Sequence, residues 1–209
     1  MLRAFVLCAV LVPGVAASAA LTDGLLVYYD FEQLVGGDGV PDRSPNGFDG
    51  LVGGGGSITL AEGVFGQAAH FQGPLPVYVA LPTPMPHDAI PTKAITVAVW
   101  VNHDPMTTDQ MEIFMPMSGG EYQKQLGHFE LRNNNTARFL LRTPVDPPED
   151  FINMNNVGAV PAKEWVHYAA TYDSVDGVGR LYINGEIVGE AFATREMYNN
   201  WDTGARVGY

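Results

Sequence analysis

The stretch "EWVHYAATYDSVDGVGRLYINGEIVG", from Glu164 to Gly189, decides the fold. It holds two apolar runs, a polar cluster with glycines between them, and Asn184-Gly185 after the second run. Asn-Gly is the strongest two-residue signal for a β-hairpin, because both residues tolerate positive φ. The stretch therefore predicts three antiparallel strands in succession. The first is apolar on both faces, which places it in the middle of a sheet.

The rest of the chain is typical of an all-β protein. Of its 209 residues, 24 are glycine, 15 are proline, and only 16% are charged. Short strand-like runs recur, each ended by Gly, Pro, Asn or Asp, and no long stretch has a helical period. Parallel crossovers need helices between the strands, and none is expected here. We therefore expect one domain, a sandwich of two antiparallel sheets.

The first 20 residues have the composition of a secretory signal peptide. Arg3 gives a short positive region, Ala4–Val15 is apolar, and Ala17–Ala20 supplies a small-residue cleavage pattern. The apolar run is too short to span a membrane. We expect 1–20 to be removed and 21–209 to be secreted or held at the cell surface, in the extracellular space or the periplasm.

The charge balance excludes one class of partner. The chain has 11 basic and 23 acidic residues, a net charge of −12. Binding of nucleic acid needs a basic patch, and none is present in the sequence. The only cysteine lies in the predicted signal peptide, so zinc held by thiolates is excluded for the mature chain. An acidic surface favours Ca²⁺, which takes oxygen ligands.

Further motifs resemble, in order, the laminin G-like jelly-roll domains of the concanavalin A-like lectin/glucanase superfamily. The opening stretch is similar to that family's Trp-x-His-x-Ala strand and Leu-Tyr-x-Asn-Gly hairpin. The other matching segments are "GLLVYYDFE", "PDRSPNGFDGLV", "GVFGQAAHFQG", "YVALP", "AITVAVWVN" and "ARVGY". The resemblance covers most of Gly24–Tyr209 and implies a jelly roll. This fold hosts lectins, adhesins, glycosidases and inert spacers, so it does not by itself define a function.

The sequence departs from the family pattern in two places. The region from His103 to Ala162 is long, and we expect Pro144–Ala162 to be an irregular loop. The family usually closes with a Gly-x-Ile-Asp-Glu-x-Arg-x-Tyr strand beside the opening strand, and no such segment precedes Tyr209. We expect either that the sequence is a fragment truncated at this strand or that another chain fills the open edge. The second alternative describes a structural subunit that self-associates.

A structural calcium site is predicted where the first strand ends and its loop begins. Oxygen donors on an irregular loop are the ligands that Ca²⁺ requires, and many relatives hold a structural Ca²⁺ in this region. The alternative is a solvated polar turn in which the aspartates bind their own backbone. The predicted ligands are Asp30, Glu32, Asp42, Asn46 and Asp49.

A ligand site is predicted around Trp201. The segment "MYNNWD" has the composition of a loop in which an aromatic ring lies among amides, which suits stacking on a sugar. The alternative is that Trp201 anchors the loop against the sandwich. Trp100 and Trp165 lie in apolar strands and are assigned to packing. The predicted ligand-binding residues are Trp201, Tyr198, Asn199, Asn200 and Asp202.

No catalytic residue is predicted. Glycoside hydrolysis needs two carboxylates at a set separation, and the Glu-x-Asp-x-x-Glu run of the family's glucanases is absent. Glu112 and Glu121 are nine residues apart, the five histidines are scattered, and no motif of a serine or zinc hydrolase is present. We therefore expect a non-enzymatic module for binding or adhesion to an extracellular glycan or a partner protein. A degenerate enzyme resembling the glycoside hydrolases is the alternative.

Overall fold

The structure is a computed structural model that describes residues 2–9, 22–73, 76–118, 124–143, 149–201 and 203–208. No helix occurs among these residues, and every pair of neighbouring strands is antiparallel. The predicted all-β sandwich with two antiparallel sheets is therefore confirmed. In this described part, no helix long and apolar enough to cross a membrane is found.

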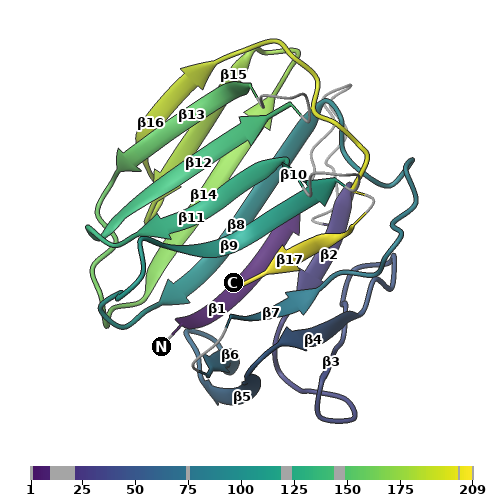
Figure 1. Cartoon of the computed structure of the whole chain (residues 1–209), viewed down its shortest axis with the longest axis vertical. Coiled ribbons are helices and arrows are strands. Elements are labelled where there is room, and N and C mark those ends of the chain that lie inside the picture. The colour runs from purple at the N-terminus through teal and green to yellow at the C-terminus, as the bar shows by residue number, and fades with distance from the viewer. Residues whose placement is uncertain are drawn as a thin grey trace.

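The strands form two sheets that overlap in the view of Figure 1. Sheet A has the order β16-β15-β14-β8-β1-β6-β5, and β2 pairs with β1. Its strands are β1 (Leu2–Ala9), β2 (Leu25–Tyr29), β5 (Ser57–Glu62), β6 (Gln67–Gln72), β8 (Ala94–Asn102), β14 (Val166–Asp173), β15 (Val178–Ile183) and β16 (Glu186–Phe192).

Sheet B has the order β13-β12-β11-β9-β17-β7-β4-β3, and β10 pairs with β9. Its strands are β3 (Gly39–Val40), β4 (Gly50–Gly54), β7 (Val77–Ala80), β9 (Gln110–Ser118), β10 (Lys124–Gln125), β11 (Gly127–Arg132), β12 (Thr136–Arg142), β13 (Asp150–Val157) and β17 (Ala205–Val207).

The stretch from Glu164 to Gly189 forms the predicted meander of β14, β15 and β16. Strand β14 lies between β15 and β8, so its predicted central position is confirmed. At the tight turn, Asn184 and Gly185 have φ of 53° and 85°, the positive values that Asn-Gly favours. In the preceding turn, Asp173 Oδ1 accepts backbone N–H bonds from Val175 and Asp176 at 2.7 and 3.1 Å. That carboxylate therefore stabilises the turn.

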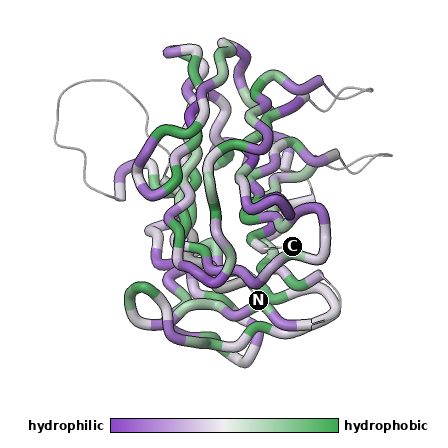
Figure 2. Tube along the Cα trace, turned by 90° about the vertical axis from the view of Figure 1, so that its left-hand side faces the viewer, coloured by the Kyte–Doolittle hydropathy of each residue, from purple (hydrophilic) through white to green (hydrophobic). Residues whose placement is uncertain are grey.

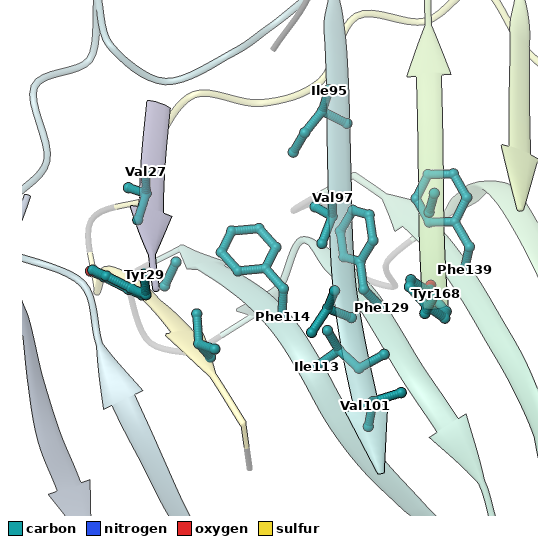
Figure 3. Close-up of a cluster of buried hydrophobic side chains, with 14 of the residues drawn as sticks. Val27, Tyr29, Ile95, Val97, Val101, Ile113, Phe114, Phe129, Phe139 and Tyr168 are labelled. Atoms are coloured by element: carbon teal, nitrogen blue, oxygen red, sulfur yellow. The ribbon is translucent and has the colours of Figure 1, made fainter. Parts of the chain in front are cut away.

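The core lies between the two sheets. Residues of β8 and β14 are alternately buried and half-buried, which is the period-2 pattern of strands with one face inside. Figure 3 shows side chains of β2, β8 and β14 in sheet A beside those of β9, β11 and β12 in sheet B. The rings of Phe129 and Phe139, on neighbouring strands, lie 4.8 Å apart. Figure 2 shows the layers from the side, with hydrophobic positions alternating along the strands.

The first described residues form a strand that was not predicted from the sequence. Leu2–Ala9, which lies inside the predicted signal peptide, forms β1 in sheet A, and it pairs with β8, β6 and β2. The place beside β2, where we expected an absent closing strand, is therefore occupied by this segment. Cleavage of 1–20 remains a prediction, and 10–21 lies outside the described residues.

The prediction of an irregular loop over Pro144–Ala162 is wrong for Asp150–Val157. These residues form β13, which pairs with β12 at the edge of sheet B. Only Ile152 and Met154 of β13 are fully buried, while three asparagines face solvent, and this polar composition concealed the strand. Edge strands need only one buried face and often expose polar side chains, which weakens their sequence signal.

Candidate functional site

The outer face of sheet B, opposite the core, carries a buried polar cluster. In β11, Phe129 and Leu131 point into the core, so the alternating residues His128 and Glu130 point to the outer face. Glu130 pairs with Glu112 of β9 on one side and with Arg138 of β12 on the other. Three adjacent strands therefore bring these side chains together.

Two glutamates and one histidine form the centre of this cluster. His128 Nδ1 lies 2.7 Å from Glu112 Oε1 and 3.3 Å from Glu130 Oε2. Only 1% of Glu112, 0% of Glu130 and 4% of His128 is exposed to solvent. Ionisable groups are rarely buried this fully unless they are paired, so the short contacts are essential to this arrangement.

Two arginines and a glutamine surround the centre. Glu130 Oε1 accepts hydrogen bonds from Nη1 of Arg132 at 2.8 Å and from Nη1 of Arg138 at 3.2 Å. Gln110 donates to Glu112 Oε1 at 3.3 Å and accepts from Arg132 at 3.0 Å. The side chains of Arg132 and Arg138 are 22% and 16% exposed, so the cluster meets solvent through them. We call these six residues the outer-face network: Gln110, Glu112, His128, Glu130, Arg132 and Arg138.

The environment moves the pKa values of the two glutamates in opposite directions. Burial raises the pKa of Glu112 to about 7, although its hydrogen bond to His128 opposes this shift. Burial also disfavours the charged form of Glu130, but the neighbouring His128 and the hydrogen bond from Arg132 outweigh burial and lower the pKa. Burial disfavours the charged form of His128, and the two glutamates outweigh that effect and raise its pKa. Below about pH 7 the network therefore pairs the carboxylic acid of Glu112 with the carboxylate of Glu130.

Three buried atoms of the network have no hydrogen-bond partner: Glu112 Oε2, Glu130 Oε2 and Arg138 Nε. Buried polar atoms are nearly always paired in folded proteins, so an unpaired group needs an explanation, such as a functional role. Here the unpaired atoms are two carboxyl oxygens, one of them on a glutamate that is protonated below about pH 7, and one guanidinium N–H donor. This combination suits a ligand group that can both donate and accept hydrogen bonds.

A metal ion fits the network less well. Glu112, His128 and Glu130 offer ligand atoms that all lie within 4.8 Å of one another, and two carboxylates with an imidazole can bind a divalent cation. However, Arg132 and Arg138 both pair with Glu130, so the cluster already holds as many guanidinium charges as carboxyl groups. A divalent ion would leave two uncompensated positive charges in a buried site, which is costly.

The predicted calcium ligands are engaged in shaping their loop. Asp42 Oδ1 accepts the backbone N–H groups of Tyr28 and Ser44, both at 2.8 Å. Asp42 Oδ2 accepts from the Ser44 hydroxyl at 2.6 Å and from the Phe48 N–H at 2.8 Å. Both oxygens are therefore saturated by protein donors, which is the polar-turn alternative.

The other four predicted ligands also have protein partners. Asp49 accepts from the backbone of Asp42, Asp30 from Arg43, and Glu32 from the backbone of Gln67. Asn46 donates its amide to the carbonyls of Leu25 and Leu26. Among the described residues, only Glu112, His128 and Glu130 form a group with metal-ligand spacing. Calcium in the Asp30–Asp49 region remains a prediction.

In the predicted ligand loop, Trp201 takes the anchoring role. Its side chain is 4% exposed and packs edge-on against Phe114, with ring centroids 5.6 Å apart. Neither face of the indole is free to stack on a sugar. Tyr198 is 39% exposed, Asn199 donates to the carbonyl of His87 at 3.3 Å, and Asn200 Oδ1 is buried without a hydrogen-bond partner. Asp202 lies outside the described residues.

The two remaining tryptophans are not core residues. Trp100 and Trp165 are only partly buried, and the ring of Trp100 lies 5.1 Å from that of His167. Trp100 alternates with the buried valines of β8, so it faces the outside of sheet A. Trp100 therefore packs on the outer surface of sheet A and not in the space between the sheets.

The outer-face network was missed in the sequence, although part of its signal is visible. In "GHFELR", His128, Glu130 and Arg132 alternate with apolar residues, which is unusual for a strand in which five of six residues are fully buried. The alternation does not reveal Glu112 as a partner of these residues. Glu112 lies opposite Glu130 only because the register of β9 against β11 shifts at this point, and such a shift is not visible in the sequence.

Comparison with solved structures shows the same fold in another protein. The binding domain of botulinum neurotoxin serotype G superposes with a TM-score of 0.51 at 12% sequence identity. The match covers 81% of this chain and 43% of that chain, so this chain spans less than half of that structure. At this identity the likeness shows the fold alone. No curated protein matches the sequence.

Comparison with family models is more informative. A laminin G model described as the Concanavalin A-like lectin/glucanases superfamily matches residues 77–209. The matched region is more than half of the chain, and it contains the whole outer-face network. The resemblance seen in the sequence motifs is thereby confirmed, and the chain belongs to the concanavalin A-like lectin/glucanase superfamily as a laminin G-like jelly-roll domain.

Proposed function

We propose that this domain is a secreted, non-enzymatic binding module that holds a glycan on the outer face of sheet B. The observation that supports this proposal is the set of unpaired buried atoms in the outer-face network, Glu112 Oε2, Glu130 Oε2 and Arg138 Nε. A sugar hydroxyl donates one hydrogen bond and accepts others, so one hydroxyl can bridge a carboxylate and a guanidinium. Such a ligand approaches from the side where Arg132 and Arg138 meet solvent.

A second feature of the same face fits this ligand class. Arg206 lies over the ring of Tyr78, with its guanidinium carbon 4.3 Å from the ring centroid, and both side chains are partly exposed. Ala205 and Val207 beside it are buried in the core, so Arg206 points to the outer face. Tyr78 lies in β7, two strands away from β9, which is about 10 Å across a sheet. An oligosaccharide can span this distance, and aromatic rings with polar neighbours are common in sugar sites.

The test is binding of the full chain to a glycan array, followed by titration of any hit. Arg138→Ala removes the unpaired donor, and we expect at least about 10-fold weaker binding, since a hydrogen bond to a charged group contributes about 1.5–3 kcal/mol. Arg180→Ala is the matched control, because Arg180 pairs with Glu190 on the surface of sheet A. Equal affinity of the Arg138→Ala variant and the wild type, with both folded, would exclude this face as the binding site.

Glycoside hydrolysis is a second candidate, favoured by the opposite pKa shifts of Glu112 and Glu130. Their contacting oxygens lie within 4.8 Å, and retaining glycosidases hold their carboxyl groups about 5–5.5 Å apart. Glu112 would be the acid and Glu130 the nucleophile. The pairing of Glu130 with two arginines weakens this candidate, because it reduces nucleophilicity. Release of reducing sugars that stops in Glu112→Gln would support hydrolysis at this site, and either no release by the wild type or equal release by the variant would refute it.

A further inference from the structure

The two glutamates of the outer-face network have unequal partners. Glu130 Oε1 accepts hydrogen bonds from Arg132 at 2.8 Å and from Arg138 at 3.2 Å. Among the described residues, Glu112 forms no ion pair with an arginine or a lysine, and its basic partner is His128, at 2.7 Å. Glu130 therefore keeps its negative charge, and Glu112 is the carboxyl group that holds a proton more easily.

The titratable and charged groups that meet in this cluster come from four strands. Within the described part of the chain they are Glu112 of β9, His128, Glu130 and Arg132 of β11, Arg138 of β12 and Tyr168 of β14. The Tyr168 hydroxyl reaches the cluster from sheet A and donates to the carbonyl of Arg138 at 2.9 Å. Burial raises the pKa of Tyr168 well above its usual range, so this group stays neutral. Near neutral pH the cluster therefore gains or loses protons at Glu112 and His128, whose pKa values are both raised.

The unpaired atoms of the network match one sugar hydroxyl only when Glu112 is protonated. A hydroxyl group donates one hydrogen bond and accepts two. Glu112 Oε1 faces His128 Nδ1, so the proton of the neutral acid lies on Oε2. The unpaired set then consists of one acceptor, Glu130 Oε2, and two donors, the O–H of Glu112 and the Nε–H of Arg138. With Glu112 ionised the set has two acceptors, and one hydroxyl leaves a buried carboxylate oxygen without a partner, which is costly.

We propose that a sugar hydroxyl binds to the outer-face network with Glu112 in its protonated form, so that glycan binding is coupled to the uptake of a proton and is stronger at acidic pH. This inference rests on the glycan site proposed above and adds the protonation state in which that site binds. A bound sugar covers the side where Arg132 and Arg138 meet solvent, and it excludes water from the cluster. A second carboxylate charge is costlier in a drier site, which also favours the neutral form of Glu112.

The test uses the full chain and an array of neutral oligosaccharides, applied at pH 6 and at pH 8. Neutral glycans are used because the attraction of a charged glycan to a protein with a net charge of −12 changes with pH for other reasons. Each oligosaccharide that binds is then titrated by calorimetry. Since the pKa of Glu112 is about 7, we expect about 10-fold weaker binding at pH 8 than at pH 6. Titrations at pH 8 in two buffers of different ionisation enthalpy should show the uptake of about one proton per bound glycan.

Glu112→Gln separates this carboxyl group from His128 as the source of the pH dependence. Glutamine does not titrate, so we expect the affinity of the variant to stay constant between pH 6 and pH 8, without proton uptake. Glu190→Gln is the matched control, because Glu190 pairs with Arg180 on the surface of sheet A, and it should retain the wild-type pH dependence. A folded Glu112→Gln variant with the wild-type pH dependence overturns the proposal. If this variant does not fold, the proton uptake of the wild-type chain decides.

The outcomes distinguish this inference from the proposed function. A folded chain that binds no oligosaccharide at either pH contradicts the proposed function and this inference together. Equal affinity at pH 6 and pH 8, without proton uptake, leaves the glycan site in place and overturns only the proton coupling. Stronger binding at pH 8 than at pH 6 overturns the proton coupling as well.

Discussion

Replacing Glu112 with glutamine is expected to stabilise the protein at alkaline pH and to flatten the dependence of its stability on pH. Burial raises the pKa of Glu112 from 4.5 to about 7, so the folded protein holds this proton more tightly than the unfolded chain. The free energy of unfolding therefore falls as the pH rises from about 4.5 through 7. Glutamine has the shape of the protonated acid and does not titrate.

The magnitude follows from the size of the shift. Each pKa unit corresponds to about 1.36 kcal/mol, so the move from 4.5 to about 7 amounts to about 3.4 kcal/mol in all, of which about 2.5 kcal/mol is lost between pH 5 and 8. The raised pKa of His128 acts in the same direction, because its contribution is present below pH 6.5 and is lost as the pH rises through the folded value. The lowered pKa of Glu130 contributes stability that is lost only as the pH falls below about 4.5, outside this window.

The assay is urea unfolding followed by tryptophan fluorescence at pH 5, 6, 7 and 8. We expect the wild-type free energy of unfolding to fall by about 2.5 kcal/mol or more over this range, and that of Glu112→Gln to fall by about 2.5 kcal/mol less. Glu190→Gln is the control, since Glu190 is exposed on sheet A and pairs with Arg180. Parallel curves for the wild type and Glu112→Gln would refute the assignment of a buried, protonated carboxyl group.

Three other changes test separate parts of the structure. Trp201→Ala should lower the free energy of unfolding by about 3–5 kcal/mol in urea unfolding, because the indole is buried against Phe114. Unchanged stability together with lost glycan binding would contradict its anchoring role. Asp42→Ala should lower the free energy of unfolding by at least about 2 kcal/mol, because the carboxylate accepts four hydrogen bonds. A chelator should lower the melting temperature of the wild type only if the predicted Ca²⁺ is bound. Gly185→Ala should lower the free energy of unfolding by about 1–2 kcal/mol, because φ is 85° although no atom lies within 4 Å of the added Cβ. Gly54→Ala should lower it more, because the added Cβ would also lie 2.0 Å from the Pro76 carbonyl oxygen. Equal losses at these two glycines would show that space around the Cβ is unimportant.

Local features of the sequence were enough to predict the fold class. The period-2 pattern and the Asn184-Gly185 turn act over a few residues, so they determine strands and hairpins without knowledge of the remaining chain. The meander of β14, β15 and β16 is confirmed for this reason. The predicted loop over Asp150–Val157 was wrong, because an exposed edge strand is identified by its pairing with β12 and not by its composition.

The functional residues were harder to predict because they come from separate strands. Asp42 was predicted as a calcium ligand and Trp201 as a ligand-binding residue, but the groups that contact them, the backbone of Tyr28 and the ring of Phe114, lie elsewhere in the sequence. Whether a carboxylate binds a metal or a backbone amide depends on those partners. The sequence could therefore name both alternatives for each residue without deciding between them.

By itself, the sequence determined an acidic, all-β jelly roll, because composition, hydrophobic period and turn residues are local properties. Tertiary structure decided where charge is buried. Glu112, His128 and Glu130 became one proton-sharing cluster only through the register of β9 against β11, which no local pattern encodes. Tertiary structure also placed Leu2–Ala9 between β8 and β2, because that position offers unpaired backbone groups and uncharged neighbours to any apolar strand.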